Sequence, residues 1–125
     1  MKFREYKTSS GKKVLAGKTA KNNEELIGQI GDEEIVLHTK KPGSPFVNIK
    51  HTGRLSKKDI KEAALFCAAY SQAWKKAKIK KDVIVHYFKG KNVYKKKGMK
   101  LGTFGVKKFR EIKVKKQDIL DFKNE

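Results

Sequence analysis

The chain has 125 residues, and its 32 lysine and arginine side chains outnumber its 13 aspartate and glutamate side chains, which gives a formal net charge of +19. A chain of this length forms a single domain, residues 1–125, with one modest hydrophobic core. Self-repulsion among so many cations opposes compaction, so we expect a polyanionic partner, with nucleic acid the first choice and an anionic membrane the second.

Three features bear on where the protein works. The sequence has no apolar run near the ~18 residues of a membrane-spanning helix, and its first residues lack the apolar core of a signal peptide. The one cysteine, Cys67, excludes an internal disulfide framework and is typical of a reducing compartment. We therefore expect a cytoplasmic protein. A role at a membrane surface is the least expected, because glycines divide the basic half and it forms no long amphipathic helix.

The first half of the chain predicts two pairs of strands separated by a short helix. Residues 2–6 and 12–16 alternate around a Ser-Gly turn and predict a β-hairpin. A short helix should follow, with Asn22 or Asn23 as its N-cap. Apolar runs at residues 35–37 and 46–49 predict two strands, and the polar loop between them contains a Pro-Gly turn that should stand at the edge of the sheet.

The second half predicts the main core helix and the rest of the sheet. Ser56 and Asp59 resemble a capping box that opens a long helix, residues 57–78, whose central part is apolar on every face. Residues 82–88 read as an internal strand, and residues 104–106 and 109–114 as further strands. The predicted fold class is α+β, a single mixed or antiparallel sheet of about six or seven strands with one short and one long helix.

Positive charge is concentrated in one part of the sequence. Residues 75–116 contain 17 lysines and arginines but two acids, a net charge of +15, whereas all other residues together contribute +4. A generic solvated surface mixes the two signs, so this segregation favours a polyphosphate-binding surface. Lysines outnumber arginines 29 to 3, which favours recognition of the backbone or the shape of a nucleic acid over base reading.

The candidate contacts fall into two groups. Glycines flank the clustered lysines and would let a phosphate approach the backbone; the lysines that we expect to contact phosphate are Lys91, Lys95, Lys96, Lys97, Lys100, Lys107 and Lys108. Tyr94, in an irregular segment, is the candidate for stacking on an unpaired base. The loop residues His38, Lys40, Lys41 and Ser44 would form a second contact or a specificity loop.

Catalytic chemistry has little support in the sequence. The three histidines lie far apart and have no cysteine companions, so we expect no metal, and no cofactor motif or catalytic triad is present. We expect a binding protein and no enzyme. Two alternatives stay open: an RNA-modifying or RNA-cleaving activity that uses His38, and DNA binding by the same lysines.

Several segments, in order along nearly the whole chain, resemble one family. They are the Gly-Lys…Asn-Glu-Glu-Leu segment (residues 17–26), the Ile-Val-Leu-His strand with its Pro-Gly-Ser turn (35–44), the alanine-rich helix (63–73), and the Val-x-Val-x-Tyr strand with the basic loop after it (83–102). The chain is similar to a free-standing NFACT-R domain, the RNA-binding module of ribosome quality-control factors that are also called fibronectin-binding proteins.

Two departures accompany the resemblance. Val36 stands where the family usually has tryptophan, and Pro45 where it has a second histidine, so an activity that needs both histidines is not expected. Full-length relatives engage tRNA on the large ribosomal subunit and help to extend stalled nascent chains. The resemblance thus implies binding to tRNA or ribosomal RNA. Because 125 residues are too few for the relatives' other domains, we expect the chain either to supply the RNA-contacting part alone or to act with a protein partner that supplies those domains.

Overall fold

The computed structural model describes residues 2–124. Its strands and helices follow one another as β1 (Arg4–Lys7), β2 (Lys13–Ala16), α1 (Ala20–Gly28), β3 (Ile35–Thr39), β4 (Val47–Lys50), α2 (Lys57–Ala69), α3 (Gln72–Lys75), β5 (Val83–Lys89), the 3-10 turn η1 (Gly90–Asn92), β6 (Val93–Tyr94), β7 (Gly105–Val106), β8 (Arg110–Val114) and α4 (Lys116–Lys123). Six strands form one sheet in the order β1-β2-β4-β3-β5-β8, and β6 and β7 form a separate two-stranded ribbon. Each strand pair is antiparallel, and the predicted α+β class is confirmed.

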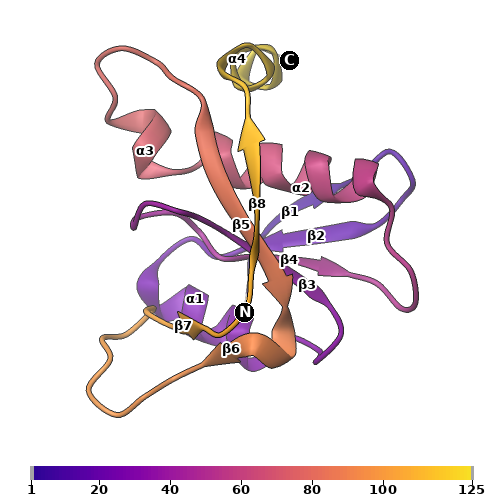
Figure 1. Ribbon diagram of the computed structural model, residues 1–125, viewed down its shortest axis with the longest axis vertical. Coiled ribbons are helices and arrows are strands. Elements are labelled where there is room, and N and C mark those ends of the chain that lie inside the picture. Colours follow the sequence, from indigo (N-terminus) through magenta and orange to yellow (C-terminus); the bar gives the residue numbers. More distant parts are fainter. Residues whose placement is uncertain (1, 125) are drawn as a thin grey trace.

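The sheet is covered on both faces because its inner strands place apolar side chains on each side. Leu37 of β3 belongs to the larger core, where α2 and α4 pack, whereas its neighbour Val36 belongs to a smaller core with Leu26 of α1 and Phe88 of β5. Phe104, from the ribbon's connecting segment, packs against this second core. Figure 1 shows α2 running across the sheet, with α1 and the ribbon gathered together at the other end of the view.

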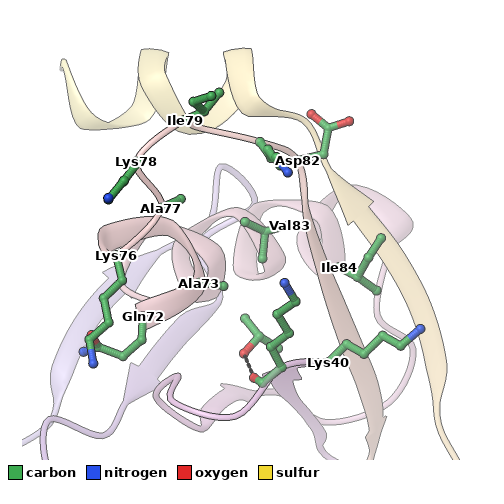
Figure 2. A pocket seen from close by; sticks show the side chains of 13 residues that line it. Lys40, Gln72, Ala73, Lys76, Ala77, Lys78, Ile79, Asp82, Val83 and Ile84 are labelled. Atoms are coloured by element: carbon green, nitrogen blue, oxygen red, sulfur yellow. Dashed lines mark hydrogen bonds between the residues drawn. The ribbon is translucent and has the colours of Figure 1, made fainter.

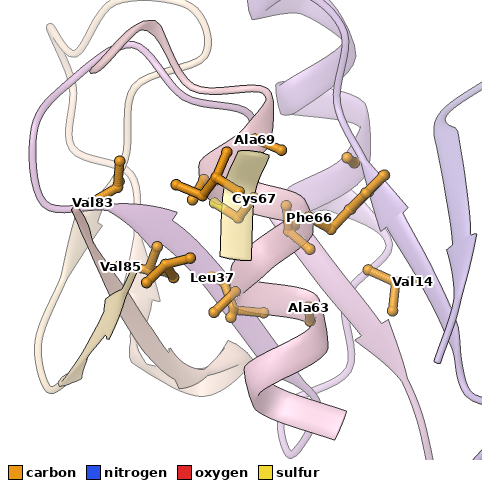
Figure 3. Close-up of a cluster of buried hydrophobic side chains, with 14 of the residues drawn as sticks. Val14, Leu37, Ala63, Phe66, Cys67, Ala69, Val83 and Val85 are labelled. Carbon is orange, nitrogen blue, oxygen red and sulfur yellow. The ribbon is translucent and has the colours of Figure 1, made fainter. Parts of the chain in front are cut away.

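Helix α2 is the main core helix, as its all-round apolar sequence predicts. Its small residues Ala63, Ala64, Ala68 and Ala69 are buried and let the sheet approach closely (Figure 3). Cys67 is fully buried among them, and burial raises the pKa of its thiol to about 12, so it is an inert packing residue.

The predicted helix over residues 57–78 is wrong at its C-terminal end. Helix α2 begins as expected, with the Ser56 Oγ accepting the Asp59 amide at 3.1 Å, but it ends at Ala69. There the Ser71 hydroxyl donates to the Ala68 carbonyl at 2.7 Å and accepts the Trp74 amide at 3.2 Å. One serine thus ends α2 and caps the short helix α3, which leaves residues 76–82 as an irregular linker.

The other helices also differ from expectation. Thr19, and not Asn22 or Asn23, is the N-cap of α1, because its Oγ1 accepts the Asn22 amide at 3.1 Å. The two asparagines instead tie neighbouring segments together: Asn22 Oδ1 accepts the Lys18 amide at 2.9 Å and Asn23 Oδ1 accepts the Phe46 amide at 3.1 Å. The predicted fold has one short and one long helix, whereas the chain also forms α3 and the C-terminal helix α4, which buries Ile119.

Candidate nucleic-acid interface

The loop between β3 and β4 has a fixed shape. The Ser44 hydroxyl accepts the Thr39 amide at 3.0 Å and donates to the Pro45 carbonyl at 3.1 Å, so it is engaged inside the loop. Gly43 has a φ of +94°, which few other residues adopt, and its carbonyl accepts the Gln72 amide of α3 at 2.8 Å. The loop therefore presents the exposed side chains of Lys40 and Lys41 from a rigid support, and a direct RNA contact by Ser44 stays a prediction.

A cleft of about 390 Å³ lies beside this loop. The β3–β4 loop forms one wall, the start of α1 another, and the segment before β7 a third, with β5 as the floor. Several of its lining residues are aromatic or imidazole rings: His38, Phe46, His86, Phe88 and Phe104. Lys40 also lines it, so the cleft combines apolar rings with a cation, as sites that stack unpaired bases do.

His38 contributes a hydrogen-bond acceptor to the cleft and no positive charge. Its ring packs on Phe46 with 4.3 Å between centroids, and burial lowers its pKa to about 4, so it is neutral at physiological pH. Its Nδ1 lies 2.8 Å from the Thr39 carbonyl, which can only accept, so Nδ1 carries the proton. Nε2 is then an acceptor, and it has no partner among the residues that the structure describes.

Next to His38 on the neighbouring strand, His86 forms an exposed aromatic pair. The two histidines are directly opposite each other on β3 and β5. The His86 ring stacks with that of Phe109 at 4.0 Å between centroids and 17° between planes, and its Nε2 lies 2.9 Å from Glu111 Oε2. Phe109 is 50% exposed, which makes it the most accessible ring near the cleft.

The segment between β6 and β7, residues 95–104, is anchored to α1 by one charge cluster. The Lys95 ammonium lies 2.8 Å from Glu24 Oε2 and 2.8 Å from the Thr103 carbonyl. The same Glu24 oxygen accepts the Gly102 amide at 2.7 Å. The hydrogen bond from Lys95 holds the Glu24 pKa below its ordinary value. Lys95 is therefore an internal anchor of the segment, although the sequence suggests a free cation.

Two glycines allow this close packing. Gly102 has a φ of +79°, and a Cβ there would lie 2.8 Å from the Ala20 Cα. Gly105 lies against the Tyr94 ring, where a Cβ would be 2.1 Å from the Tyr94 Cζ. One face of the Tyr94 ring is thus covered by backbone, and the Lys96 ammonium lies 5.6 Å from the ring centroid. Stacking of Tyr94 on a base stays a prediction.

The predicted phosphate contacts divide into paired and free cations. Lys91 is paired with Glu33 at 3.2 Å, and Lys40 lies 3.8 Å from Glu111. Among residues 2–124, no side-chain hydrogen bond or ion pair engages several exposed lysines of the prediction: Lys41, Lys97, Lys100, Lys107 and Lys108. These five lysines, together with Lys96, whose ammonium lies near the Tyr94 ring, are the predicted contacts that stay available to a ligand.

Sequence reasoning missed two kinds of residue at this site. Glu24 lies near the start of α1, and nothing in the neighbouring sequence indicates that it pairs with Lys95, which is 71 residues away. Phe46 was assigned to a strand, and its place in the cleft follows only from how β4 pairs with β2 and β3. Within the described residues, no group of three metal-ligating side chains comes together, and no helix is long and apolar enough to cross a membrane.

Two of three comparisons with known proteins gave a match. The C-terminal of the fibronectin/fibrinogen-binding protein from Streptococcus suis has a similar structure, with a TM-score of 0.82 and 23% identity over 97% of this chain and 49% of that chain. This chain thus spans about half of that one, and the likeness concerns the fold. A search of the curated proteins gave no match. The model of the family described as "NFACT protein RNA binding domain" matches residues 2–108, so the chain belongs to this family of RNA-binding domains.

Proposed function

We propose that the protein binds tRNA or ribosomal RNA through a face that combines the aromatic cleft with the free lysines around it. One observation carries the proposal: a cleft lined by rings and by Lys40 lies between the β3–β4 loop and the β6–β7 segment, and both of these segments carry exposed lysines without partners. Lysines are point charges suited to phosphate, and rings accept any unstacked base. The arrangement favours backbone contact together with an unpaired nucleotide, which single-stranded loops and ends of RNA offer.

RNA is favoured over DNA by the neutral imidazole in the cleft. A 2′-hydroxyl is a hydrogen-bond donor that RNA has and DNA lacks. His38 Nε2 is an acceptor without a partner among residues 2–124, and it is unprotonated at neutral pH. Competition between structured RNA and duplex DNA of equal length tests this preference, with RNA expected to bind more tightly.

The cellular setting is proposed from the family resemblance. Relatives in ribosome quality control engage tRNA on the large ribosomal subunit, and the proposed role is RNA contact in that process in the cytoplasm. A protein partner would supply the other activities of the pathway. Crosslinking in cells, followed by sequencing of the attached RNA, identifies the RNA directly.

We propose binding without catalysis. A general base works best when its pKa is near the operating pH, whereas the pKa of His38 is about 4. Replacement of His38 by alanine should leave any slow RNA turnover in the preparation unchanged. Turnover that disappears in this variant, with RNA affinity intact, would instead establish an RNA-directed enzyme.

Removal of three lysines tests the proposed face. We expect a K97Q/K100Q/K107Q variant to bind structured RNA more weakly, with the slope of log affinity against log salt reduced by about one for each lysine that contacts phosphate. The matched control, K57Q/K58Q/K61Q, removes the same charge from the start of α2, where these exposed lysines make no ion pair within the described chain. Figure 1 shows the start of α2 at the opposite side from the β6–β7 segment. Equal losses in both variants would contradict a localised site.

A further inference from the structure

A second hollow, separate from the cleft, lies on the other side of the β3–β4 loop. It is a groove of about 570 Å³ between this loop, helix α3, the linker of residues 76–82 and the start of β5 (Figure 2). Five lysines line it: Lys40, Lys41, Lys76, Lys78 and Lys81. Three of these, Lys76, Lys78 and Lys81, belong to the linker, whose residues 76–78 fall within the helix that the sequence predicts.

The charge of this groove is not matched by acids. Among residues 2–124, the ammonium groups of Lys76, Lys78 and Lys81 have no hydrogen-bond or ion-pair partner. The one carboxylate in the lining, that of Asp82, accepts the Lys116 amide at 2.8 Å and lies at the side of the groove next to β8 (Figure 2). A groove whose lining holds five lysines and one carboxylate is suited to a polyanion.

The walls of the groove are fixed in place. The Lys80 ammonium donates to the Trp74 carbonyl at 2.6 Å and lies 5.0 Å from the centre of the Trp74 ring, which ties the linker to α3. On the opposite wall, the Lys40 amide donates to the Ile84 carbonyl at 2.9 Å. The groove therefore exists before any ligand binds, and little order has to be gained on binding.

An exposed apolar side chain stands among the linker lysines. Ile79 lines the groove and is 74% exposed, the highest value among the large apolar side chains that are exposed in the described chain. Its flanking residues Lys78 and Lys80 are both cationic. An apolar group between cations fits a ligand that alternates charged and uncharged parts, as phosphate, ribose and base do in a nucleic acid.

The groove and the cleft share a wall. Lys40 lines both hollows, and the β3–β4 loop separates them. We propose that the groove is a second RNA-binding site, which holds the phosphate backbone of the strand that leaves the cleft and crosses the β3–β4 loop. This inference rests on the proposed function. It assigns the linker lysines to phosphate contact and Ile79 to an apolar contact with ribose or base.

A length series of single-stranded RNA tests the assignment. A K76Q/K78Q/K81Q variant should bind short oligonucleotides as the wild type does, but lose affinity for long ones, with the salt slope for long RNA reduced by about one per lysine. The variant Ile79→Ala should weaken long RNA without changing the salt slope. The K57Q/K58Q/K61Q protein has the same net charge as the K76Q/K78Q/K81Q variant, but it should bind RNA of every length with the affinity of the wild type.

The contrary results separate the two proposals. If the groove variant binds long RNA as the wild type does while the K97Q/K100Q/K107Q variant binds it more weakly, the groove is not a second RNA-binding site. The proposed function is unaffected by that result. An equal loss of affinity of the groove variant for RNA of all lengths would contradict the proposal that one strand continues from the cleft into the groove. Binding of poly-glutamate that depends on the groove lysines, with RNA unaffected, would assign the groove to an acidic protein segment. A wild type that binds no RNA would overturn both proposals.

Discussion

At the scale of single residues, the environment of each cation decides what it can do. Lys95 and Lys97 stand two positions apart in one lysine run, yet the first is held by Glu24 and the second has no partner within the described chain. The run predicts a basic segment correctly. It cannot predict which member is neutralised, because the acid Glu24 comes from the N-terminal half and meets Lys95 only after folding.

His38 carries a prediction about pH at this same scale. Its pKa in the folded protein is about 4 because it is buried, whereas an exposed histidine titrates near pH 6.5. The unfolded chain therefore takes up the proton first, and the free energy of unfolding should fall by on the order of 2 kcal/mol as the pH drops from about 6.5 to about 4.

Urea denaturation at pH 7 and pH 4.5 measures this effect. In the variant His38→Gln, which has no titrating group at this position, the loss of stability between the two pH values should be smaller than in the wild type by that amount. Carboxylates titrate alike in both proteins and cancel in the comparison. An identical pH dependence would show that the His38 ring is accessible to protons in the folded state.

At the scale of elements, alternation and capping signals predict the strands and helices but not how these pair and pack with one another. The hairpin of β1 and β2, the strand β5 and the capped start of α2 follow from local patterns. The break at Ser71 does not, because AALFCAAYSQAW reads as an uninterrupted helix while the serine hydroxyl bonds to backbone on both sides. The position of β4 between β2 and β3 likewise depends on pairing between strands distant in sequence, which local patterns do not predict.

The anchor of the β6–β7 segment gives a prediction at this scale. In Glu24→Ala the Lys95 ammonium and the Gly102 amide both lose their carboxylate partner. Hydrogen exchange at the Gly102 amide should become faster, while global stability changes by less than about 1 kcal/mol because the pair is partly exposed. RNA affinity should fall as well, since the free lysines of this segment lose their fixed positions.

The matched control is Glu33→Ala, which breaks the exposed pairs to Lys89 and Lys91 outside this segment. It should leave the exchange rate at Gly102 as in the wild type. Unchanged exchange in Glu24→Ala would mean that the segment is held by the packing of Gly102 on Ala20 and of Phe104 on Phe46 alone.

At the scale of the whole molecule, folding partly mixes the charges that the sequence keeps apart. Acids of the first half reach lysines of the second, and the lysines that stay unpaired include those of the β6–β7 segment, the β3–β4 loop and the α3–β5 linker as well as those at the start of α2. Figure 1 shows these three segments extending toward one side of the sheet, with the start of α2 on the other side. The unpaired lysines of these three segments are the ones that we propose as the RNA-binding interface.

The most direct test of this interface is the salt dependence of RNA affinity. The dissociation constant of the wild-type protein for one structured RNA should be measured across a series of salt concentrations. If about five phosphates are neutralised, log affinity should fall against log salt with a slope of about −4, and less steeply for a single strand. An affinity that hardly changes across the titration would contradict binding through unpaired lysines.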